Sequence, residues 1–240
     1  MPRSITMVNP KIFMIATSSS MMNNGEPTGL WLGDLTTPYY TFADAGCEVT
    51  LTSMSGGPIP VEPRSLLPRG TNERSIERYL GDPSLQEKCE TTLRFDAVSL
   101  AGFDALFLSG GHGAMFDFPG NEALTGVIEA FDRATKVIAA VSHGPAGLID
   151  ARSETGAPFV RGRHVAAFTE TEERAAGLQD AMPFGLESRL RALGALYQAG
   201  PDSGPFAVRD GRLITGQNPA SAARVADLAL DAIGQTKEAA

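Results

Sequence analysis

The 240-residue chain contains few cysteines, no run of basic residues and no long apolar segment. Its two cysteines, Cys47 and Cys89, lack the spacing of a metal or redox motif, which favours reduced thiols in a reducing compartment. A net charge of −8 without a basic cluster argues against nucleic acid and anionic membranes as partners. No apolar run approaches the ~18 residues of a membrane span, and residues 12–16 are too short for a signal peptide. These absences predict a cytoplasmic protein.

The composition that is present suits one globular domain. Hydrophobic residues make up 42% of the chain and charged residues 20%, as in soluble proteins that bury a core. The sequence has no internal repeat, low-complexity tract or linker, so residues 1–240 are expected to form a single domain.

The centre of the chain, residues 103–150, predicts a strand–helix–strand unit. Short apolar runs at 105–108 and 137–141 each end in small residues, as buried parallel strands do. Residues 121–135 lie between them and have the spacing of a helix with one apolar face, formed by Leu124, Val127, Ile128 and Phe131. The loops that follow the two strands should therefore lie at the same edge of the sheet.

The other segments continue this alternation of strands and helices. We expect strands at 11–17 and 48–54, a hairpin around Asp210-Gly211, and a final helix over 218–233. Together they predict a doubly wound, flavodoxin-like α/β fold, in which helices flank a mostly parallel sheet. Its functional site should lie at the carboxyl ends of the strands.

Proline and glycine modify two predicted helical regions. A helix capped by Thr28 should run towards Gly46 and be kinked or broken near Pro38. Residues 71–93 have a polar helical pattern that the Gly-Asp-Pro sequence at 81–83 should divide in two. We expect this second region to form a small cap over the sheet.

The two central strands end in distinctive loops, G-G-H-G at 110–113 and S-H-G-P at 142–145. In the second loop a hydroxyl residue ends the strand, and Pro145 can begin a new helix. Ser142 would then lie at a strand-to-helix turn near unpaired backbone N–H groups, which suits a nucleophile and an oxyanion. The same pattern also suits an ordinary serine N-cap, and A-V-S-H-G lacks the first glycine of the hydrolase motif.

Several segments resemble the ThiJ/PfpI family, also called the DJ-one superfamily. They are S-G-G-H-G-A-M-F-D-F-P and A-A-V-S-H-G-P-A-G-L in the central unit, and T-G-L-W-L-G-D-L-T-T-P-Y, F-T-E-T-E-E and D-G-R-L-I-T-G-Q-N-P-A-S elsewhere. The similarity is strongest to the branch that contains glyoxalase III enzymes and heat-shock chaperones, and it covers nearly the whole chain. It implies a class I glutamine amidotransferase-like fold, a homodimer and no cofactor.

The resemblance also implies roles for individual residues. The family has a cysteine at the strand-to-helix turn, where this chain has Ser142. A glutamate that contacts this position in the family matches Asp34, which is one methylene shorter. His143 and Glu173 match the histidine and acid of a nucleophile–histidine–acid arrangement. The N–H groups of Gly111 and His143 match the oxyanion hole.

Each of these positions also has a plain structural interpretation. Asp34 can be a solvated helix carboxylate, His143 a spacer whose imidazole bonds a nearby carboxylate, and Glu173 a first-turn acid favoured by the helix dipole. The candidate walls of a small, partly apolar substrate cavity are Trp31, Met115 and Phe116.

The sequence gives little basis for a metal or phosphate site. Its three histidines, His112, His143 and His164, are scattered and have no cysteine partners. Gly110-Gly111 lacks the lysine and the spacing of a phosphate-binding loop, so close backbone approach is its expected role. We therefore expect neither a metal nor a cofactor.

Serine in place of the family's cysteine leaves three interpretations. A thiol at this turn would be largely ionised, whereas a hydroxyl needs a general base. Ser142 can be a deliberate replacement that silences a cysteine enzyme, a natural nucleophile with Asp34 or His143 as its base, or part of an inactive binding site. Asp34 is a second departure that such silencing would not need, and it favours a natural branch.

These observations predict a cofactor-independent hydro-lyase of the glyoxalase III type, acting on a small reactive carbonyl compound such as methylglyoxal. One alternative is an isocyanide-hydratase-like enzyme, because family members of that type pair an aspartate with the nucleophile. Another is a non-catalytic chaperone or stress-binding protein. Turnover of a carbonyl or isocyanide would indicate an enzyme, whereas suppression of client aggregation without turnover would indicate a chaperone.

Overall fold

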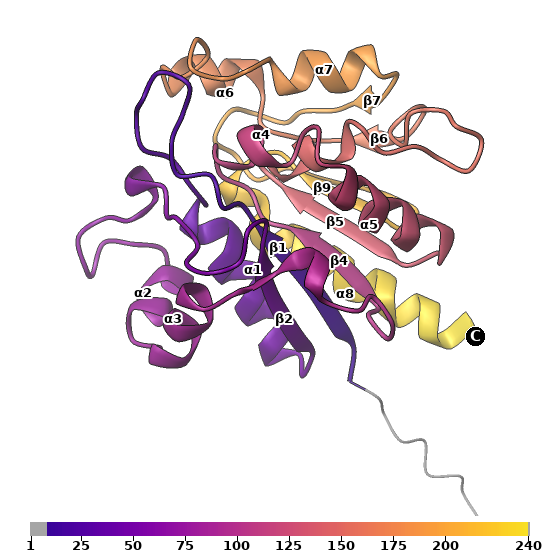
Figure 1. Cartoon of the computed structure of the whole chain (residues 1–240), viewed down its shortest axis with the longest axis horizontal. Helices are drawn as coiled ribbons and strands as arrows, with labels where there is room; N and C mark the ends of the chain where they lie inside the picture. Colours follow the sequence, from indigo (N-terminus) through magenta and orange to yellow (C-terminus); the bar gives the residue numbers. More distant parts are fainter. Residues whose placement is uncertain (1–8, 240) are drawn as a thin grey trace, which may run out of the picture.

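A seven-stranded sheet forms the centre of the protein (Figure 1). The computed structural model describes residues 9–239, with side chains to residue 234. The strand order is β3-β2-β1-β4-β5-β9-β8, and every neighbouring pair is parallel except the β8–β9 hairpin. The strands are β1 (Lys11–Ala16), β2 (Glu48–Ser53), β3 (Leu93–Arg94), β4 (Ala105–Leu108), β5 (Val137–Val141), β8 (Ala207–Asp210) and β9 (Leu213–Gly216). The predicted flavodoxin-like α/β fold is confirmed.

Helices cover both faces of this sheet (Figure 1). On one face lie α1 (Leu32–Asp44) and α8 (Ala222–Ala239), which also contact each other. On the other face lie α4 (Ala114–Asp117) and α5 (Glu122–Arg133). Short 3-10 helices occur at η1 (Pro63–Ser65), η2 (Phe95–Ala97), η3 (Gly144–Leu148) and η4 (Pro219–Ser221).

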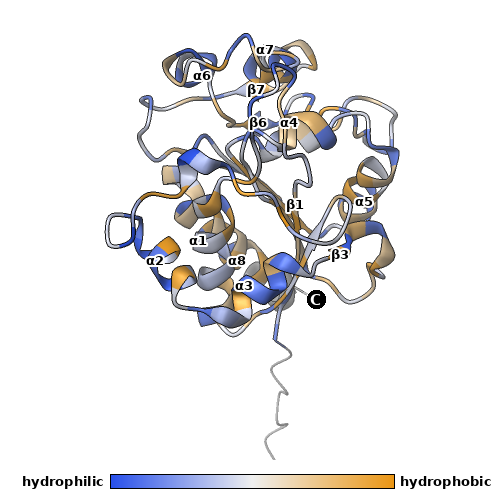
Figure 2. Cartoon of the chain, turned by 60° about the vertical axis from the view of Figure 1, so that its left-hand side comes forward, coloured by the Kyte–Doolittle hydropathy of each residue, from blue (hydrophilic) through white to orange (hydrophobic). Residues whose placement is uncertain are grey.

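Two hydrophobic cores form because successive strand residues point to opposite faces of the sheet. On β1, Phe13 and Ile15 pack in the core beneath α5, whereas Ile12 and Met14 pack in the core beneath α1 and α8. The predicted apolar face of α5 is buried as expected, with Leu124, Val127, Ile128 and Phe131 in the first core. Figure 2 shows apolar residues concentrated along the inner elements and polar residues on the outer turns.

Helix α1 differs from its prediction in where it begins and in being unbroken at Pro38. Thr28 does not cap it, because its hydroxyl donates a hydrogen bond of 3.1 Å to Glu62 and the helix begins only at Leu32. Pro38 lies inside a continuous helix, so the predicted break is wrong. The buried inner face of the helix supplies enough packing to outweigh the roughly 3 kcal/mol that an interior proline costs.

The region at 71–93 is divided as predicted, into α2 (Arg74–Leu80) and α3 (Pro83–Glu90), but it is not a cap over the sheet. It lies beside α1 (Figure 1), and α2 packs against that helix. Leu85 and Cys89 of α3 belong to the same buried core as α1. The expectation of a cap formed by this region is therefore wrong.

The small cap is instead built from a later segment, beyond the carboxyl ends of the strands (Figure 1). It contains α6 (Glu170–Ala175), α7 (Leu186–Ala192) and a separate two-stranded parallel sheet of β6 (His164–Val165) and β7 (Leu196–Tyr197). This position places α6 directly above the edge of the sheet where the loops after β4 and β5 meet.

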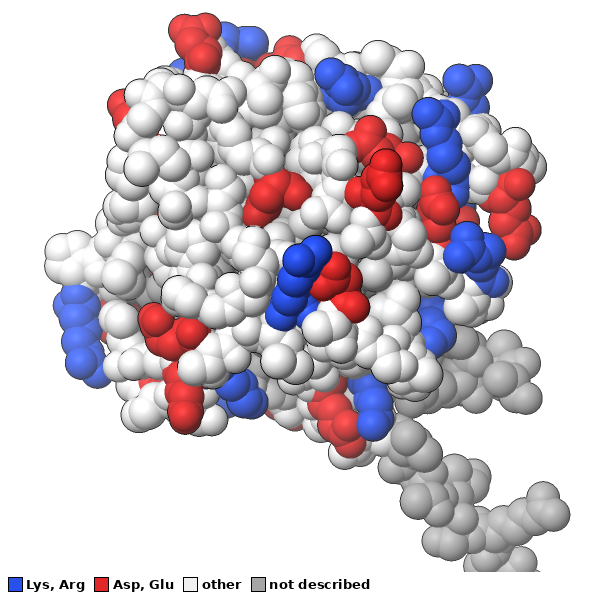
Figure 3. Space-filling view, viewed as in Figure 1, with Lys and Arg blue, Asp and Glu red and all other residues white. Residues whose placement is uncertain are grey.

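The surface contains no dominant basic region on the face that Figure 3 shows, where lysine and arginine side chains are dispersed among acidic ones. Within residues 9–239, we find no helix with the length and hydropathy that crossing a bilayer requires.

Candidate active site

Ser142 follows β5 directly and has a left-handed backbone conformation, with φ 58°. Such a conformation costs a residue with a Cβ atom roughly 1–2 kcal/mol. Two backbone bonds hold it in place: the Ser142 N–H donates to Gly216 O (2.9 Å), and Phe168 N–H donates to Ser142 O (3.0 Å). The serine is therefore held on a strained turn by β9 and by the segment before α6, a geometry that suits a nucleophile on a strand-to-helix turn.

The helix predicted after Pro145 is only the five-residue 3-10 helix η3. Gly144 and Gly147 favour helix weakly, and a Cβ atom on Gly144 would lie 2.4 Å from the carbonyl oxygen of Leu108. This segment is therefore pressed against β4 and cannot continue as an α-helix. The new helix that Pro145 was predicted to begin is therefore a single short 3-10 helix.

The glycine loop after β4 brings its backbone close to Ser142. A Cβ atom on Gly110 would lie 2.5 Å from the Asp34 carboxyl oxygen Oδ2 and 2.7 Å from the Ser142 Cβ atom. Gly111 has φ 107°, and its Cβ atom would lie 2.2 Å from the backbone nitrogen of Trp31. No side chain fits at either position, which explains the glycine pair.

The structure brings Ser142, His143 and Glu173 into one chain of hydrogen bonds. The Ser142 hydroxyl lies 3.4 Å from Nδ1 of His143, and Nε2 of the same imidazole lies 2.9 Å from Oε2 of Glu173. Adjacent residues can face each other here because Ser142 turns the backbone sharply. Only 1% of the His143 side chain is exposed, so this chain of contacts is shielded from solvent.

His112 is a member of this group that the sequence interpretation missed. Its Nε2 lies 2.8 Å from Oε1 of Glu173, and the ring centroids of His112 and His143 are 4.2 Å apart. Phe168 lies 4.5 Å from the His143 ring and closes the group from the side of the cap. The signal available in the sequence was topological, since His112 and His143 both follow strands that end at the same sheet edge.

The two histidines hold Glu173 in its charged form. Burial alone would raise the pKa of Glu173, but His143 and the hydrogen bond from His112 together lower that pKa well below its usual range. Burial also lowers the pKa of His112, and the neighbouring His143 lowers it further. The group therefore contains one carboxylate and a neutral His112 at neutral pH.

A second carboxyl group near Ser142 is that of Asp34, which approaches from α1, whereas Glu173 approaches from α6. Asp34 lies in the first turn of α1 and is completely buried. Burial raises the pKa of Asp34 well above its usual value, the Ser142 hydroxyl opposes this shift, and the charge of Glu73 adds to it. Within residues 9–239 neither carboxyl oxygen has a partner with hydrogen-bond geometry. The hydroxyl thus acts on Asp34 at close range without completing a hydrogen bond.

The N–H groups of Gly111 and His143, expected to bind an oxyanion, have no acceptor in the part of the chain that the structure describes. Both residues line the cavity that contains Ser142. Unpaired N–H groups beside a nucleophile are the donors that an oxyanion requires.

The cavity over Ser142 has a volume of about 450 Å³. It is lined by Trp31, Arg64, Gly111, His112, Ser142, His143, Phe168, Glu172, Ala175, Ala176, Asp202, Ser203, Asn218, Pro219 and Ala220. Trp31 is a wall of the cavity, as expected. Met115 and Phe116 are not among its lining residues, because α4 directs Met115 into the hydrophobic core and Phe116 packs against that core.

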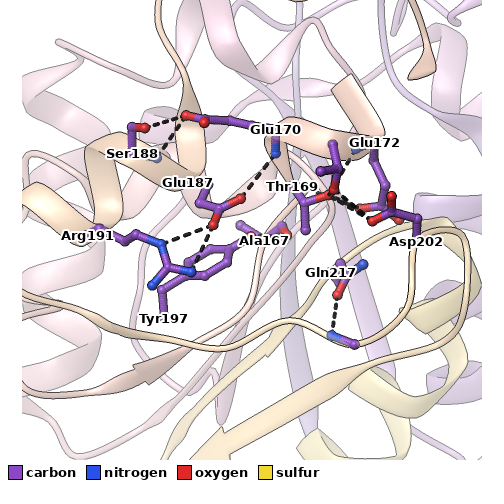
Figure 4. Close-up of polar contacts among 12 residues, drawn as sticks. Ala167, Thr169, Glu170, Glu172, Glu187, Ser188, Arg191, Tyr197, Asp202 and Gln217 are labelled. Carbon is purple, nitrogen blue, oxygen red and sulfur yellow. Dashed lines mark hydrogen bonds and ion pairs between the residues drawn. The ribbon is translucent and has the colours of Figure 1, made fainter. Parts of the chain in front are cut away.

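A polar network connects α6, the helix that carries Glu173, to neighbouring segments, and Figure 4 shows part of it around Thr169, Glu170 and Glu172. Thr169 and Glu172 form a reciprocal capping box at the start of the helix. The Glu172 carboxylate also accepts hydrogen bonds from the Ser203 N–H (2.8 Å) and the Asn218 side chain (2.7 Å). Glu172 thereby joins three segments next to Glu173.

The donor atoms of His112, His143 and Glu173 all lie within 4.8 Å of one another, as they would in a metal site. However, each carboxylate oxygen of Glu173 already accepts a hydrogen bond from one imidazole. A cation would have to displace both hydrogen bonds, so we assign these residues to a hydrogen-bonded group.

Comparison with known proteins finds named relatives that match most of the chain. The chain is 32% identical to the glutathione-independent glyoxalase hsp3101 of Schizosaccharomyces pombe, over 92% of this chain and 94% of that protein. It is 27% identical to Glyoxalase 3 of Candida albicans, over 92% of this chain and 96% of that protein.

Two solved structures are also similar to this one. The crystal structure of glyoxalase III from Candida albicans matches with a TM-score of 0.85 and 26% identity, covering 93% of this chain and 97% of that one. The Rapid Encystment Protein 24 KDa of Francisella tularensis matches with a TM-score of 0.88 and 32% identity, covering 93% and 99%. The model of the DJ-1/PfpI family matches residues 32–232, and the chain therefore belongs to that family.

Proposed function

We propose that the protein is a cofactor-independent glyoxalase of the glyoxalase III type, a lyase that converts a small 2-oxoaldehyde such as methylglyoxal into the 2-hydroxy acid. One observation supports this most directly: the Ser142 hydroxyl lies between a buried Asp34 and the His143–Glu173 pair. The reaction needs a nucleophile and two separate proton carriers, and this arrangement supplies all three. The similarity to named glyoxalases supports the same assignment.

In the first step, the Ser142 Oγ atom attacks the aldehyde carbon C1. His143 Nδ1 takes the hydroxyl proton, and Glu173 stabilises the imidazolium that results. The negative charge that forms on the C1 oxygen is bound by the N–H groups of Gly111 and His143.

The second step is an internal redox reaction between C1 and C2, and it uses Asp34 as the proton carrier. The ionised Asp34 carboxylate removes the proton from C1, while His143 gives its proton to the C2 oxygen. Asp34 then returns its proton to C2, so that C1 becomes an ester carbonyl and C2 an alcohol. C1 is oxidised and C2 is reduced by the same two electrons, so no external oxidant or cofactor is required. A raised pKa suits a group that must both accept and return a proton.

In the last step, water attacks the ester that joins the product to Ser142. His143 takes a proton from the water and returns it to the serine oxygen, which releases the 2-hydroxy acid. The atoms balance as one 2-oxoaldehyde plus one water giving one 2-hydroxy acid.

The test compares lactate formation from methylglyoxal by the unchanged protein, Ser142→Cys and Ser142→Ala. The alanine variant should be inactive, and the cysteine variant should be faster by about tenfold or more, because a thiolate is the stronger nucleophile. The gain should disappear when Asp34 or His143 is also replaced, since groups that act together do not contribute additively.

Two results would change this assignment. A cysteine variant no faster than the unchanged protein would indicate a site adapted to serine chemistry, and isocyanides would be tested next. If both the serine and the cysteine forms are inactive on aldehydes, the glyoxalase proposal is wrong. Suppression of client aggregation in the absence of turnover would then favour the chaperone interpretation.

We also infer that the protein is a cytoplasmic homodimer. Membership of the DJ-1/PfpI family and the reduced cysteines expected from the sequence support this inference. Light scattering at micromolar concentration should give twice the mass of the chain, and a monomer mass would contradict it.

A further inference from the structure

Two imidazoles share one carboxylate in the active site. Glu173 Oε1 lies 2.8 Å from His112 Nε2, and Glu173 Oε2 lies 2.9 Å from His143 Nε2. All three side chains are largely buried, with 5% of His112, 1% of His143 and 12% of Glu173 exposed. Solvent therefore screens these contacts weakly, and the position of each proton strongly affects the electrostatic interaction among the three side chains.

The contacts determine which nitrogen of each ring carries a proton. An ionised carboxylate only accepts hydrogen bonds, so both Nε2 atoms must donate to Glu173. The lone pair of His143 Nδ1 is then left to accept from the Ser142 hydroxyl, at 3.4 Å. The corresponding Nδ1 atom of His112 is buried and has no partner among the residues that the structure describes.

This sharing divides the charge of one carboxylate between two rings. Each hydrogen bond that Glu173 accepts reduces the pull of the carboxylate on the other imidazole. The rings lie 4.2 Å apart between centroids, so a proton on one ring opposes a proton on the other. Burial and the proximity of His143 both lower the pKa of His112, so the proton taken from Ser142 belongs on His143.

Other ionisable groups also act on this pair. Arg64, which lies in η1, lowers the pKa of His112. Asp34 faces Ser142 from α1, and burial raises its pKa. Glu172 and Asp202 line the same cavity from α6 and from the loop before β8. None of these groups shares a hydrogen bond with either ring, so His112 is, after Glu173 itself, the ionisable group with the most direct influence on His143.

We propose that His112 is a positioning residue that shares the Glu173 carboxylate with His143 and so limits the basicity of the catalytic imidazole. This proposal rests on the proposed function for its meaning, because it assigns His143 as the base. Without the His112 hydrogen bond, Glu173 would act on His143 alone, and His143 would remain protonated at higher pH. A protonated His143 cannot accept the Ser142 proton, so the enzyme would lose activity at neutral pH.

The experiment is an NMR titration of the histidine rings, which needs no substrate and is therefore independent of the proposed activity. The chain has three histidines, and the exposed His164 bonds Gln198 outside the active site. His164→Gln assigns that signal and is the matched control. In the unchanged protein, nitrogen shifts should place the proton of both active-site rings on Nε2 near neutral pH.

The diagnostic variants are His112→Leu, which removes the shared hydrogen bond, and His112→Gln, which can still donate an N–H to Glu173. The His143 titration midpoint should rise by about one pH unit in the leucine variant and stay near the unchanged value in the glutamine variant. The acidic limb of kcat/KM for lactate formation should move in the same direction. Rescue by glutamine would separate the hydrogen bond from simple packing.

Equal His143 midpoints in all folded forms would overturn the proposal, leaving His112 with a packing role only. If the leucine variant does not fold, as judged by its melting transition, the proton positions in the unchanged protein decide. A proton on Nδ1 of His112 would mean that its Nε2 does not donate to Glu173, and the proposal would be wrong. If the NMR result holds but no aldehyde is converted, the proposed function fails and the shared carboxylate stands.

Discussion

The two sides of Ser142 each contain a buried carboxyl group, yet the groups behave in opposite ways. On the α1 side, Asp34 is fully buried without a completed hydrogen bond, and burial raises its pKa. On the α6 side, Glu173 is also mostly buried, but two imidazoles lower its pKa. Burial raises the pKa of both groups, but only at Glu173 do the interaction with His143 and the hydrogen bonds from both imidazoles outweigh it.

This difference suits two different tasks. A carboxyl group with a raised pKa can exchange a proton with the substrate, whereas a permanently charged one can only orient and stabilise a neighbour. The two carboxyl groups are also held in place by different kinds of contact. Asp34 is held by the packed interior of α1, and Glu173 depends on the polar network around Glu172 (Figure 4).

The largest expected effect comes from replacing Asp34, the proposed proton carrier on the α1 side. Asp34→Asn should lower kcat for lactate formation by about 10²–10⁴-fold, because an amide cannot accept the C1 proton. Asp44→Asn, at the exposed end of the same helix, is the matched control and should retain activity. Steady-state kinetics with methylglyoxal would measure both, and comparable activity in Asp34→Asn would remove Asp34 from the mechanism.

A smaller loss is expected on the α6 side. Glu173→Gln should lower kcat by about 10–10²-fold, because an amide still positions His143 but no longer stabilises its protonated form. The acidic limb of the kcat/KM profile should move to lower pH, since His143 loses its negative partner. An unchanged pH profile would show that Glu173 has no electrostatic effect on His143.

The burial of Asp34 also predicts an effect on stability. Asp34→Asn should stabilise the folded protein at neutral pH by about 1–3 kcal/mol, since it removes the cost of ionising a buried carboxyl group. The folded pKa of Asp34 lies above its unfolded value near 3.9. Its favourable contribution is therefore complete below about pH 4 and is lost as pH rises through the folded pKa. Melting temperatures should diverge over that range, and a difference independent of pH would contradict this account.

The smallest effect concerns metal ions. Dialysis against a chelator should leave lactate formation unchanged, because both Glu173 oxygens are already bonded to histidines. Activity that falls on dialysis and returns with one divalent cation would show that the His112, His143 and Glu173 group binds a metal. The difference between the two carboxyl groups would then need another explanation.

The sequence alone determined the elements whose signals are local. The apolar spacing within 121–135 identified α5 and its buried face, and the runs at 105–108 and 137–141 identified two parallel strands. The family motifs pointed to Ser142 and Glu173 as neighbours. Periodicity and turn residues are properties of short segments, so they are readable without a fold.

The tertiary structure decided what depends on contacts between distant segments. Thr28 bonds Glu62 instead of capping α1, and Pro38 is accommodated by packing that its local sequence does not reveal. Met115 lies in the core and not in the cavity because the orientation of α4 directs it there.

His112 shows the same limit within the active site. Its role depends on one carboxylate, Glu173, that is 61 residues away in the chain and is carried by the cap. The sequence placed His112 and His143 after neighbouring strands, but it contained no signal that both rings would face the same oxygen pair. The folded protein alone decides how two histidines share one negative charge, because that charge acts through space and not along the chain.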